Sequence, residues 1–391
     1  MKVENKGGAL KILAELCRLL IGVVFIFSGF VKAVDPVGGA IKIGEYLASF
    51  GLDMLQPFTV LLSFNLSAIE FALGVCMLLG VYRRYVSFLV LAFMAFMTPL
   101  TLYLALFDPV SDCGCFGDAL VISNWETFFK NIVLSLAAIV TFIYNQRLFQ
   151  CFTFRVYWFV ALYAYLFGVG FAYYNYNHLP VIDFRPYKVG ANIPELMEIP
   201  EGAPQDEYKY TFVYEKDGVK KEFSLEDYPA NDSSWTFVDS KTELVKKGYQ
   251  PPVAAFNIYN GEGDDVTEEI IGNPGPVLLL VAPKLEEADD EQMDEINGVY
   301  DYALEHDIPF YCVTGSSPEA IDAWSDNTGA EYPFRMADEV LLKTIIRSNP
   351  GLVLLKGGTI LGKWHYNDIP AEEDVKAVMD RCLGKLPKLT Y

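Results

Sequence analysis

Hydrophobic and polar positions divide the chain into two halves with different patterns. Up to residue 178, long apolar runs alternate with short polar loops, whereas the later residues show short apolar runs between many charged positions. A helix needs about 20 mostly apolar residues to cross a bilayer. Five runs reach or approach that length, so the pattern predicts five membrane-spanning helices, at residues 10–34, 58–79, 85–107, 128–144 and 156–175.

The basic residues between these runs predict an orientation, because lysine and arginine accumulate in cytoplasmic loops. Three basic groups fall on one side of the five spans. They are Lys2, Lys6 and Lys11, then Arg83 and Arg84, then Arg147 and Arg155. We therefore expect a bacterial inner (cytoplasmic) membrane protein with a cytoplasmic N-terminus and a periplasmic or otherwise extracytoplasmic C-terminal half. Four basic residues lie on the predicted outer side and count against it: Lys32, Lys42, Arg185 and Lys188.

Charge within a membrane span is costly, so charged side chains there turn toward the bundle interior, and two of those in the predicted spans are the best placed to do so. They are Arg18 in the first span and Glu70 in the second. The simplest arrangement is a mutual ion pair that ties the two helices together. A role in proton or ligand handling is the alternative.

Candidate chemistry is concentrated in the stretch Asp112-Cys113-Gly114-Cys115-Phe116-Gly117-Asp118, which follows the third span on the predicted outer side. A disulfide between thiols one residue apart closes a small ring that departs from relaxed geometry and is easily reduced, so the pair favours redox use. Two half-buried cysteines in a tight loop, or a stabilising clip, are the alternatives. The acidic neighbours are expected to raise the thiol pKa values, which works against a reactive thiolate.

After residue 178 the pattern changes to that of a soluble protein. A proline-rich linker leads to two alternating runs, 208–214 and 219–225, around the turn Lys216-Asp217-Gly218, which predicts a β-hairpin. Residues 235–238 are a candidate third strand. From residue 250 onward, buried strands alternate with helices and a hairpin follows, which predicts an α/β sandwich with a mixed sheet.

Composition narrows the range of functions. The 391-residue chain carries a net charge of −20, which argues against nucleic acid as a partner because phosphates are repelled. Its three histidines are far apart, and its seven cysteines are too few for a disulfide scaffold. Cys113 and Cys115 with Asp112 or Asp118 could bind a soft metal, but this ligand set is thin, so we expect no metal site.

The membrane half resembles the DoxX family and the related MauE group over about residues 10–144. The resemblance rests on the first-helix pattern Arg18, Gly22, Phe25, Gly29 and Lys32, on Glu70, Gly74 and Gly80 in the second, and on the loop Asp-Cys-Gly-Cys-Phe-Gly. It implies a four-helix membrane bundle linked to quinone-coupled sulfur oxidation or to disulfide handling in exported enzymes. It also implies Cys113 and Cys115 as the thiol pair. The fifth span and the large second half depart from the family.

Residues 250–389 resemble the thioredoxin superfamily, especially its exported, membrane-tethered members. The resemblance implies that the Asn349-Pro350 bond is cis. Where a redox thioredoxin carries Cys-x-x-Cys, this chain has Ala282-Pro283-Lys284-Leu285-Glu286, so we expect no thioredoxin activity from this part. Cys312 and Cys382 are expected to be small core residues.

The expected architecture is a membrane α-helical bundle joined to an α/β thioredoxin-like soluble domain. The expected divisions are a DoxX/MauE-like membrane domain at 1–150, a fifth helix at 151–178, a linker with a small β-hairpin at 179–249, and the thioredoxin-like domain at 250–391.

For function, we expect thiol–disulfide or quinone-linked electron transfer through Cys113 and Cys115 at the outer face, as an oxidoreductase component. A quinone is the candidate cofactor, and the lipid bilayer and an exported or membrane protein are the expected partners. A non-catalytic scaffold built from degenerate redox folds is the alternative, and the sequence leaves open whether the chain is an enzyme.

Overall fold

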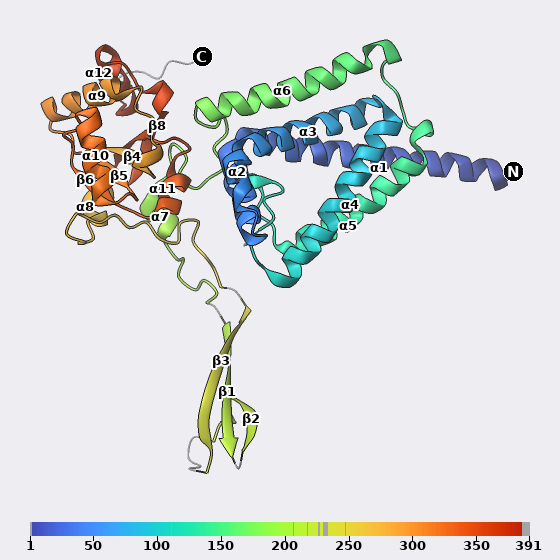
Figure 1. Cartoon of the computed structure of the whole chain (residues 1–391), viewed down its shortest axis with the longest axis horizontal. Helices are drawn as coiled ribbons and strands as arrows, with labels where there is room; N and C mark the ends of the chain where they lie inside the picture. Colours follow the sequence, from blue (N-terminus) through green and yellow to red (C-terminus); the bar gives the residue numbers. More distant parts are fainter. Residues whose placement is uncertain are drawn as a thin grey trace.

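A computed structural model describes residues 2–110, 112–205, 207–216, 218–225, 227–229, 234–246 and 248–384. The membrane half contains five long helices: α1 (Lys2–Val34), α3 (Thr59–Leu79), α4 (Arg83–Phe107), α5 (Asn124–Ile143) and α6 (Tyr157–Asn177). Helix α1 lies along α3, α4 lies along α5, and α6 covers the other side of α3 (Figure 1). This arrangement confirms the predicted membrane bundle.

Four segments among the described residues are long and apolar enough to cross a membrane. They are Asp53–Leu79, Arg83–Phe107, Asn124–Ile143 and Phe154–Asn177. Helix α1 packs lengthwise against the first of these and leaves Leu16, Leu20 and Val23 exposed on its outer side. Apolar side chains facing outward from a membrane bundle face lipid. We therefore count α1 as the remaining span.

Glycines allow α1 and α3 to approach each other closely. A Cβ atom added at Gly74 would lie 2.6 Å from the backbone nitrogen of Ile26, and one added at Gly29 would collide with the backbone of Phe71. Small residues at a helix contact increase van der Waals packing where lipid provides no hydrophobic driving force. The two helices run antiparallel, since Gly29 faces Ser67 and Phe71 whereas Gly22 faces Leu78.

Short elements close the end of the bundle that contacts the α/β domain. Helix α2 (Pro36–Ser49) follows α1 directly, and the Asp35 side chain caps it by accepting a hydrogen bond from the Gly38 nitrogen. The 3-10 turn η1 (Asp53–Phe58) then leads into α3, and η2 (Gly117–Ala119) lies in the loop between α4 and α5. At the opposite end, η3 (Asn145–Arg147) and η4 (Phe154–Val156) connect α5 to α6.

A separate antiparallel sheet of order β2-β1-β3 follows the linker and projects away from both halves (Figure 1). Its strands are β1 (Glu207–Lys216), β2 (Val219–Ser224) and β3 (Thr236–Lys246), preceded by the short helix α7 (Ile193–Met197). The hairpin prediction is confirmed, although Asp217 of the predicted turn lies outside the described residues. Strand β3 is longer than the predicted third strand because it pairs with β1 along nearly its whole length.

The C-terminal part is an α/β domain with a five-stranded sheet of order β6-β5-β4-β7-β8. Strands β4, β5 and β6 are parallel, and β7 and β8 are antiparallel to their neighbours. The elements are α8 (Thr267–Ile271), β4 (Pro276–Ala282), η5 (Leu285–Glu287), α9 (Met293–Glu305), β5 (Phe310–Thr314), α10 (Pro318–Thr328), β6 (Phe334–Met336), α11 (Glu339–Ile345), β7 (Gly351–Lys356), β8 (Thr359–His365), η6 (Tyr366–Asp368) and α12 (Glu372–Cys382). The order and directions confirm the thioredoxin-like fold.

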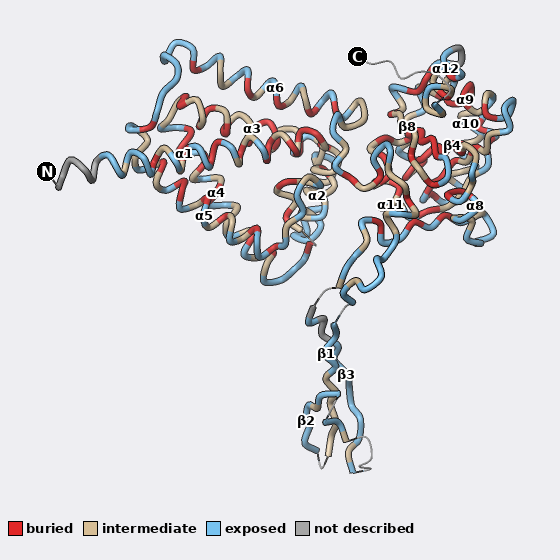
Figure 2. Tube along the Cα trace, turned by 180° about the vertical axis from the view of Figure 1, so that it is seen from behind, coloured by how far each residue is buried: buried red, intermediate tan, exposed pale blue. Residues whose placement is uncertain are grey.

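Both faces of this sheet are buried, as the near-continuous apolar run in β4 predicts. Val277, Leu279 and Val281 point into one core cluster, whereas Leu278 and Leu280 point into the other. Buried positions accordingly run through the middle of the domain (Figure 2). The Asn349–Pro350 peptide bond at the start of β7 is cis, as predicted.

Candidate functional site

The two paired cysteines lie in the loop after α4, at the end of the bundle that contacts the α/β domain. Gly114 adopts a left-handed conformation with φ of 63°, and its nitrogen donates a hydrogen bond to Asp112 Oδ1 at 2.8 Å. Glycine accepts this conformation without steric cost. The sulfur atoms of Cys113 and Cys115, both free thiols, lie 2.7 Å apart. Their proximity makes a reversible disulfide geometrically accessible.

Cys113 is a buried residue, with 7% of its surface exposed. It packs against Leu104 and Val110. The Tyr46 hydroxyl of α2 donates a hydrogen bond to the Cys113 carbonyl oxygen at 2.8 Å and so ties the loop to α2. The hydrogen bond to Cys115, together with burial, raises the pKa of the Cys113 thiol.

Cys115 has a different electrostatic setting. The hydrogen bond from the Cys113 thiol, aided by the positive charges of Lys130 and Lys32, lowers the pKa of Cys115 despite its burial. Lys130 lies on α5, 4.1 Å from the centre of the Phe116 ring. Cys115 is therefore the better candidate for the nucleophilic thiolate.

The expectation that acidic neighbours would raise both thiol pKa values is therefore wrong for Cys115. The Asp112 carboxylate pairs with Lys42 at 3.1 Å, and the Asp118 carboxylate lies 3.6 Å from the Arg347 guanidinium. Cations from α1 and α5, which are distant in sequence, act on Cys115 instead.

The predicted ion pair between Arg18 and Glu70 is also wrong. Glu70 pairs with Lys32, whose Nζ lies 2.7 Å and 2.9 Å from the two carboxylate oxygens. Arg18 pairs with Glu15 at 2.6 Å and donates to the carbonyl oxygens of Met77 and Leu78 at the end of α3.

Helix geometry explains this difference. Arg18 and Lys32 are 14 positions apart on α1, which is about 21 Å along the axis at 1.5 Å per residue. Because α3 runs antiparallel, Glu70 lies at the level of Lys32, whereas the carbonyl groups of Met77 and Leu78 at the end of α3 lie at the level of Arg18. Carbonyl groups in the last turn of a helix lack the usual helical partner, and Arg18 donates hydrogen bonds to these two; the Met77 oxygen also accepts one from the Gly80 nitrogen at 3.3 Å.

Ser28 connects the buried pair to the cysteine loop. Its hydroxyl oxygen lies 2.7 Å from Glu70 Oε2 and 2.8 Å from the Cys115 carbonyl oxygen, and it accepts a hydrogen bond from Lys32 at 2.9 Å. A cavity of about 30 Å³ lies at this point, and its wall includes Cys115, Lys32 and Glu70. The sequence placed Lys32 in the first-helix pattern and on the predicted outer side, but it indicated no role at the cysteines for Lys32, Ser28 or Lys130. The spacing of Ser28 and Lys32, one helical turn apart on the face of Phe25, was the available signal.

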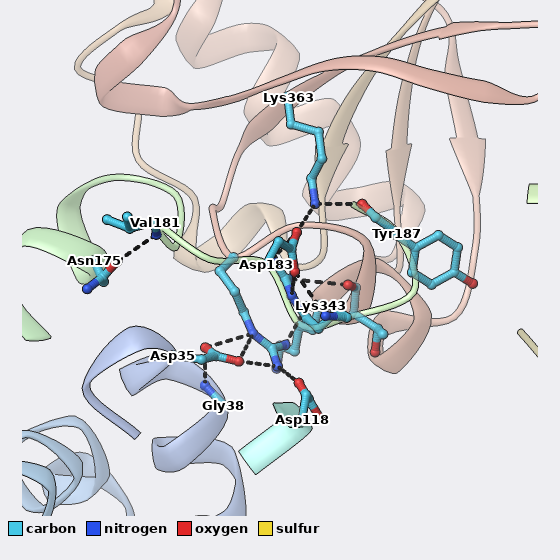
Figure 3. A network of polar contacts seen from close by, with 12 residues as sticks. Asp35, Gly38, Asp118, Asn175, Val181, Asp183, Tyr187, Lys343 and Lys363 are labelled. Atoms are coloured by element: carbon cyan, nitrogen blue, oxygen red, sulfur yellow. Dashed lines mark hydrogen bonds and ion pairs between the residues drawn. The ribbon is translucent and has the colours of Figure 1, made fainter. Parts of the chain in front are cut away.

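The same end of the bundle contacts the α/β domain through Arg347, which follows α11. Arg347 donates hydrogen bonds of 2.9–3.0 Å to both oxygens of Asp35. Burial raises the Asp35 pKa, but Arg347 outweighs burial and holds that pKa below its usual value. Figure 3 shows Asp35, Asp118 and Asp183 of the linker gathered at this junction. Asp183 in turn binds Arg185 and Lys363 at 2.8 Å and 2.9 Å.

Two larger cavities flank Arg347. One, of about 310 Å³, is walled by Gly114 and Asp118 of the cysteine loop and by Lys343 of α11. The other, of about 540 Å³, lies between the two halves and is walled by Pro283, Lys284 and Asn349 of the α/β domain. Pro283 and Lys284 belong to the segment directly after β4, in which this chain has no Cys-x-x-Cys sequence. In the described part of the chain no cysteine lines this second cavity.

The remaining cysteines of the α/β domain lie elsewhere. Cys312 is fully buried in β5, and burial raises the pKa of its thiol, so it is a core residue as expected. Cys382 packs against the same core cluster from α12, and both are free thiols. Among the described residues, no group of three histidine, cysteine, aspartate or glutamate side chains could hold a metal ion.

Comparison with known proteins gives matches to separate parts of the chain. Residues 10–144 match the family model described as Methylamine utilisation protein MauE, and residues 208–247 match a domain of unknown function. No curated protein matches the chain. Among solved structures, a solution structure from Bacteroides thetaiotaomicron that carries the name of a protein disulfide isomerase is similar at 18% identity and a TM-score of 0.27. That match covers 32% of this chain and 84% of the other. The membrane half is thus MauE-like, and its apolar helices place the protein in a lipid bilayer. The likeness to DoxX stays a prediction.

Proposed function

We propose that this chain, with its MauE-like membrane half, is the thiol–disulfide exchange component of a membrane redox system. Cys113 and Cys115 alternate between the dithiol and the disulfide. The observation that carries the proposal is the pair of free thiols 2.7 Å apart, beside two lysines that favour a thiolate on Cys115. A low thiol pKa beside cationic groups is the setting of reactive cysteines in proteins.

The exchange takes place at the outer surface of the membrane. The cysteine loop and the Arg347 contact lie at the same end of the bundle, where Asp35 and Asp118 both meet the α/β domain. The basic residues Arg83 and Arg147 lie at the opposite end, between α3 and α4 and in η3. The positive-inside rule supports a cytoplasmic location for that end and a periplasmic one for the cysteines.

The electron partner is either an exported or membrane protein with a cysteine pair, or a quinone in the bilayer. The cavity of about 540 Å³ between the halves has room for a few side chains of such a partner, and it shares Lys343 and Arg347 with the cavity that borders Gly114. The α/β domain contributes no thiol there. Its role is to position the partner over the cysteine loop.

Trapping of the thiol state in native membranes tests the proposal. Cells are quenched in acid and treated with a maleimide of defined mass before and after reduction. We expect the Cys113–Cys115 pair to be partly oxidised and to shift toward the dithiol on exposure to reductant. A variant with both residues changed to serine should lose the shift. A pair that stays reduced under every growth condition, with an unaltered phenotype in the serine variant, would exclude thiol–disulfide exchange.

The replacement of the Cys-x-x-Cys position by Pro283 and Lys284 favours a second candidate, a non-catalytic scaffold that binds a partner through degenerate redox folds. Such a scaffold would retain a stable partner regardless of redox state. Purification in mild detergent with and without reductant distinguishes the two. A partner that remains bound in both, and with the Cys113→Ser and Cys115→Ser variants, favours the scaffold.

A further inference from the structure

Lys32 and Glu70 form a buried ion pair within the membrane half. Glu70 is 3% exposed, and Lys32 Nζ lies within 2.9 Å of both of its oxygens. Ionisable groups at this position are expensive and are usually functional. A buried ion pair is also weak evidence for stability, because apolar residues of the same size often serve as well. Close packing at the glycines and the hydrogen bonds of Arg18 already stabilise the contact between α1 and α3, so that contact does not require the Lys32–Glu70 pair.

The Lys32–Glu70 pair lies close to Cys115, the proposed nucleophile. Ser28 bridges from Glu70 to the Cys115 backbone through contacts of 2.7 Å and 2.8 Å. The cavity of about 30 Å³ borders Cys115, Lys32 and Glu70 together, and Lys130 completes its polar wall. A polar cavity needs only about 10–15 Å³ to hold a water molecule. The cavity is therefore large enough for one water molecule next to the polar groups of Ser28, Lys32 and Glu70.

We propose that Lys32, Glu70 and Ser28 are the proton-exchange site of the cysteine pair. Glu70 accepts and returns the thiol protons through Ser28 and cavity water, and Lys32 stabilises the thiolate of Cys115. The inference deepens the proposed thiol–disulfide exchange and rests on it.

The proton balance shows why such a site is needed. With a partner disulfide as oxidant, the Cys115 thiolate forms a bond to one partner sulfur, and the partner's S–S bond breaks to release the other sulfur as a thiolate. Cys113 then loses its proton, its sulfur bonds to that of Cys115, and the second partner sulfur leaves. Two electrons pass to the partner. Two protons leave the cysteines and are taken up by the two partner sulfurs, and Glu70 holds each proton in between.

The charged groups that face Cys115 come from three helices and from its own loop. They are Lys32 of α1, Glu70 of α3, Lys130 of α5 and the Cys113 thiol. Loss of a cation should raise the Cys115 pKa, and loss of the carboxylate charge should lower it. These shifts show which charges act on Cys115, and the rate of disulfide closure then shows whether Glu70 transfers a proton.

The first test is the pH dependence of Cys115 alkylation in the full-length protein, purified in detergent with Cys113 changed to serine. We expect Lys32→Met to move the midpoint of the alkylation rate to higher pH and Glu70→Gln to move it to lower pH. Arg18→Met is the matched control, since it removes the other buried cation of α1 without touching the site, and it should leave the midpoint unchanged. Shifts of the same sign, or equal shifts in the control, would overturn the proposal.

The second test is the rate at which oxidised glutathione, as the disulfide probe, closes the Cys113–Cys115 disulfide. Glu70→Gln should slow closure by about 10²-fold, the range of a lost proton-transfer group, even though it increases the thiolate fraction. Glu70→Asp should recover part of the rate. Ser28→Ala, which keeps both charges and so protects folding, should also slow closure.

The outcomes separate this inference from the function on which it rests. If the wild-type pair never closes, the proposed exchange fails. If the wild-type pair closes and Glu70→Gln and Ser28→Ala close at the same rate, only the proton-exchange site is wrong.

Discussion

The hydrogen bond from Cys113 to Cys115 is the largest single influence on the thiol that we expect to react. This hydrogen bond stabilises the Cys115 thiolate and so lowers the Cys115 pKa. It also raises the pKa of the Cys113 thiol, which makes Cys113 the weaker acid. The two cysteines are therefore not equivalent, although they are one residue apart in a near-symmetric sequence.

Changing Cys113 to alanine should therefore weaken the nucleophile. The variant loses the donor, the Cys115 pKa rises, and alkylation at pH 7 slows, with its midpoint moving to higher pH. Cys113→Ser is the matched control, because a hydroxyl still donates a hydrogen bond, and it should retain most of the wild-type rate. Rates of maleimide addition across pH 5–9 measure both. Equal rates in the alanine and serine variants would contradict the role of this contact.

Which residues carry charge inside the membrane could be predicted from the sequence, but their partners could not. The sequence predicts that Arg18 and Glu70 are buried polar residues. Each, however, pairs with a residue at the same level of the bundle: Arg18 with Glu15, and Glu70 with Lys32. The register of α3 against α1 decides this, and it follows from where Gly29 and Gly74 allow the backbones to meet. A single sequence shows the glycines, but it does not show which residues of α1 and α3 lie opposite one another.

At the scale of elements, the α1–α3 contact supports the site because it brings Ser28 and Lys32 to Glu70. Gly29→Leu should force the helices apart, since an added Cβ already collides with the Phe71 backbone. We expect a loss of unfolding free energy of at least about 1–3 kcal/mol, as in overpacked cores. We also expect faster alkylation of Cys115 as its cover loosens. Thermal unfolding in detergent and alkylation measure the two effects.

Gly170→Leu on α6 is the matched control for this change, because a Cβ atom at Gly170 meets nothing within 4 Å. It should leave both the unfolding temperature and Cys115 alkylation as in the wild type. If Gly29→Leu behaves like Gly170→Leu, the close contact of α1 and α3 does not control access to the cysteine.

The sheet of β1, β2 and β3 is an element that the rest of the fold does not require. Its strands pair only with one another, and Glu207 pairs with Lys246, so its two ends lie close together. Replacing residues 207–246 with a short Gly-Ser linker should preserve membrane insertion, the unfolding temperature and Cys115 alkylation. A large drop in unfolding temperature, measured in detergent, would show that the sheet supports one of the halves.

The hairpin was predictable from its alternation and Gly218, whereas the full length of β3 was not. The exposed strand alternates polar residues such as Ser240 and Thr242 with charged ones, so it shows little of the apolar pattern on which strand prediction depends. In the α/β domain the buried strands β4 and β7 were predictable, since both faces are covered and their apolar runs are nearly continuous.

At the scale of the whole molecule, periodicity predicts two halves but not how they meet. The contact of Arg347 with Asp35 joins residues 312 positions apart, and nothing in the sequence indicates that the two meet. The Arg347 side chain is 8% exposed and binds both Asp35 oxygens, with Asp118 at 3.6 Å. Planar bidentate pairs of this kind are among the stronger charge-assisted contacts.

Arg347→Met should release the α/β domain from the cysteine loop. Hydrogen bonds to charged groups contribute about 1.5–3 kcal/mol, so amide exchange at the docked surface should increase roughly ten-fold or more. The increase should be confined to the start of α2, to residues 112–118 and to the loop around Asn349. Hydrogen–deuterium exchange with mass spectrometry measures it. Arg335→Met is the matched control, since Arg335 stacks on Tyr311 within the α/β domain.

The same contact sets the pH range in which the halves stay docked. The Asp35 pKa is lower in the folded protein than its usual value of about 3.9, so its contribution to docking is fully present above that value and is lost as pH falls through the folded pKa. The wild type should therefore show protected exchange at pH 5 and at pH 7, whereas Arg347→Met should be unprotected at both. Protection of the variant at either pH, or exchange in the wild type that rises already between pH 7 and 5, would mean that another contact holds the α/β domain over the cysteines.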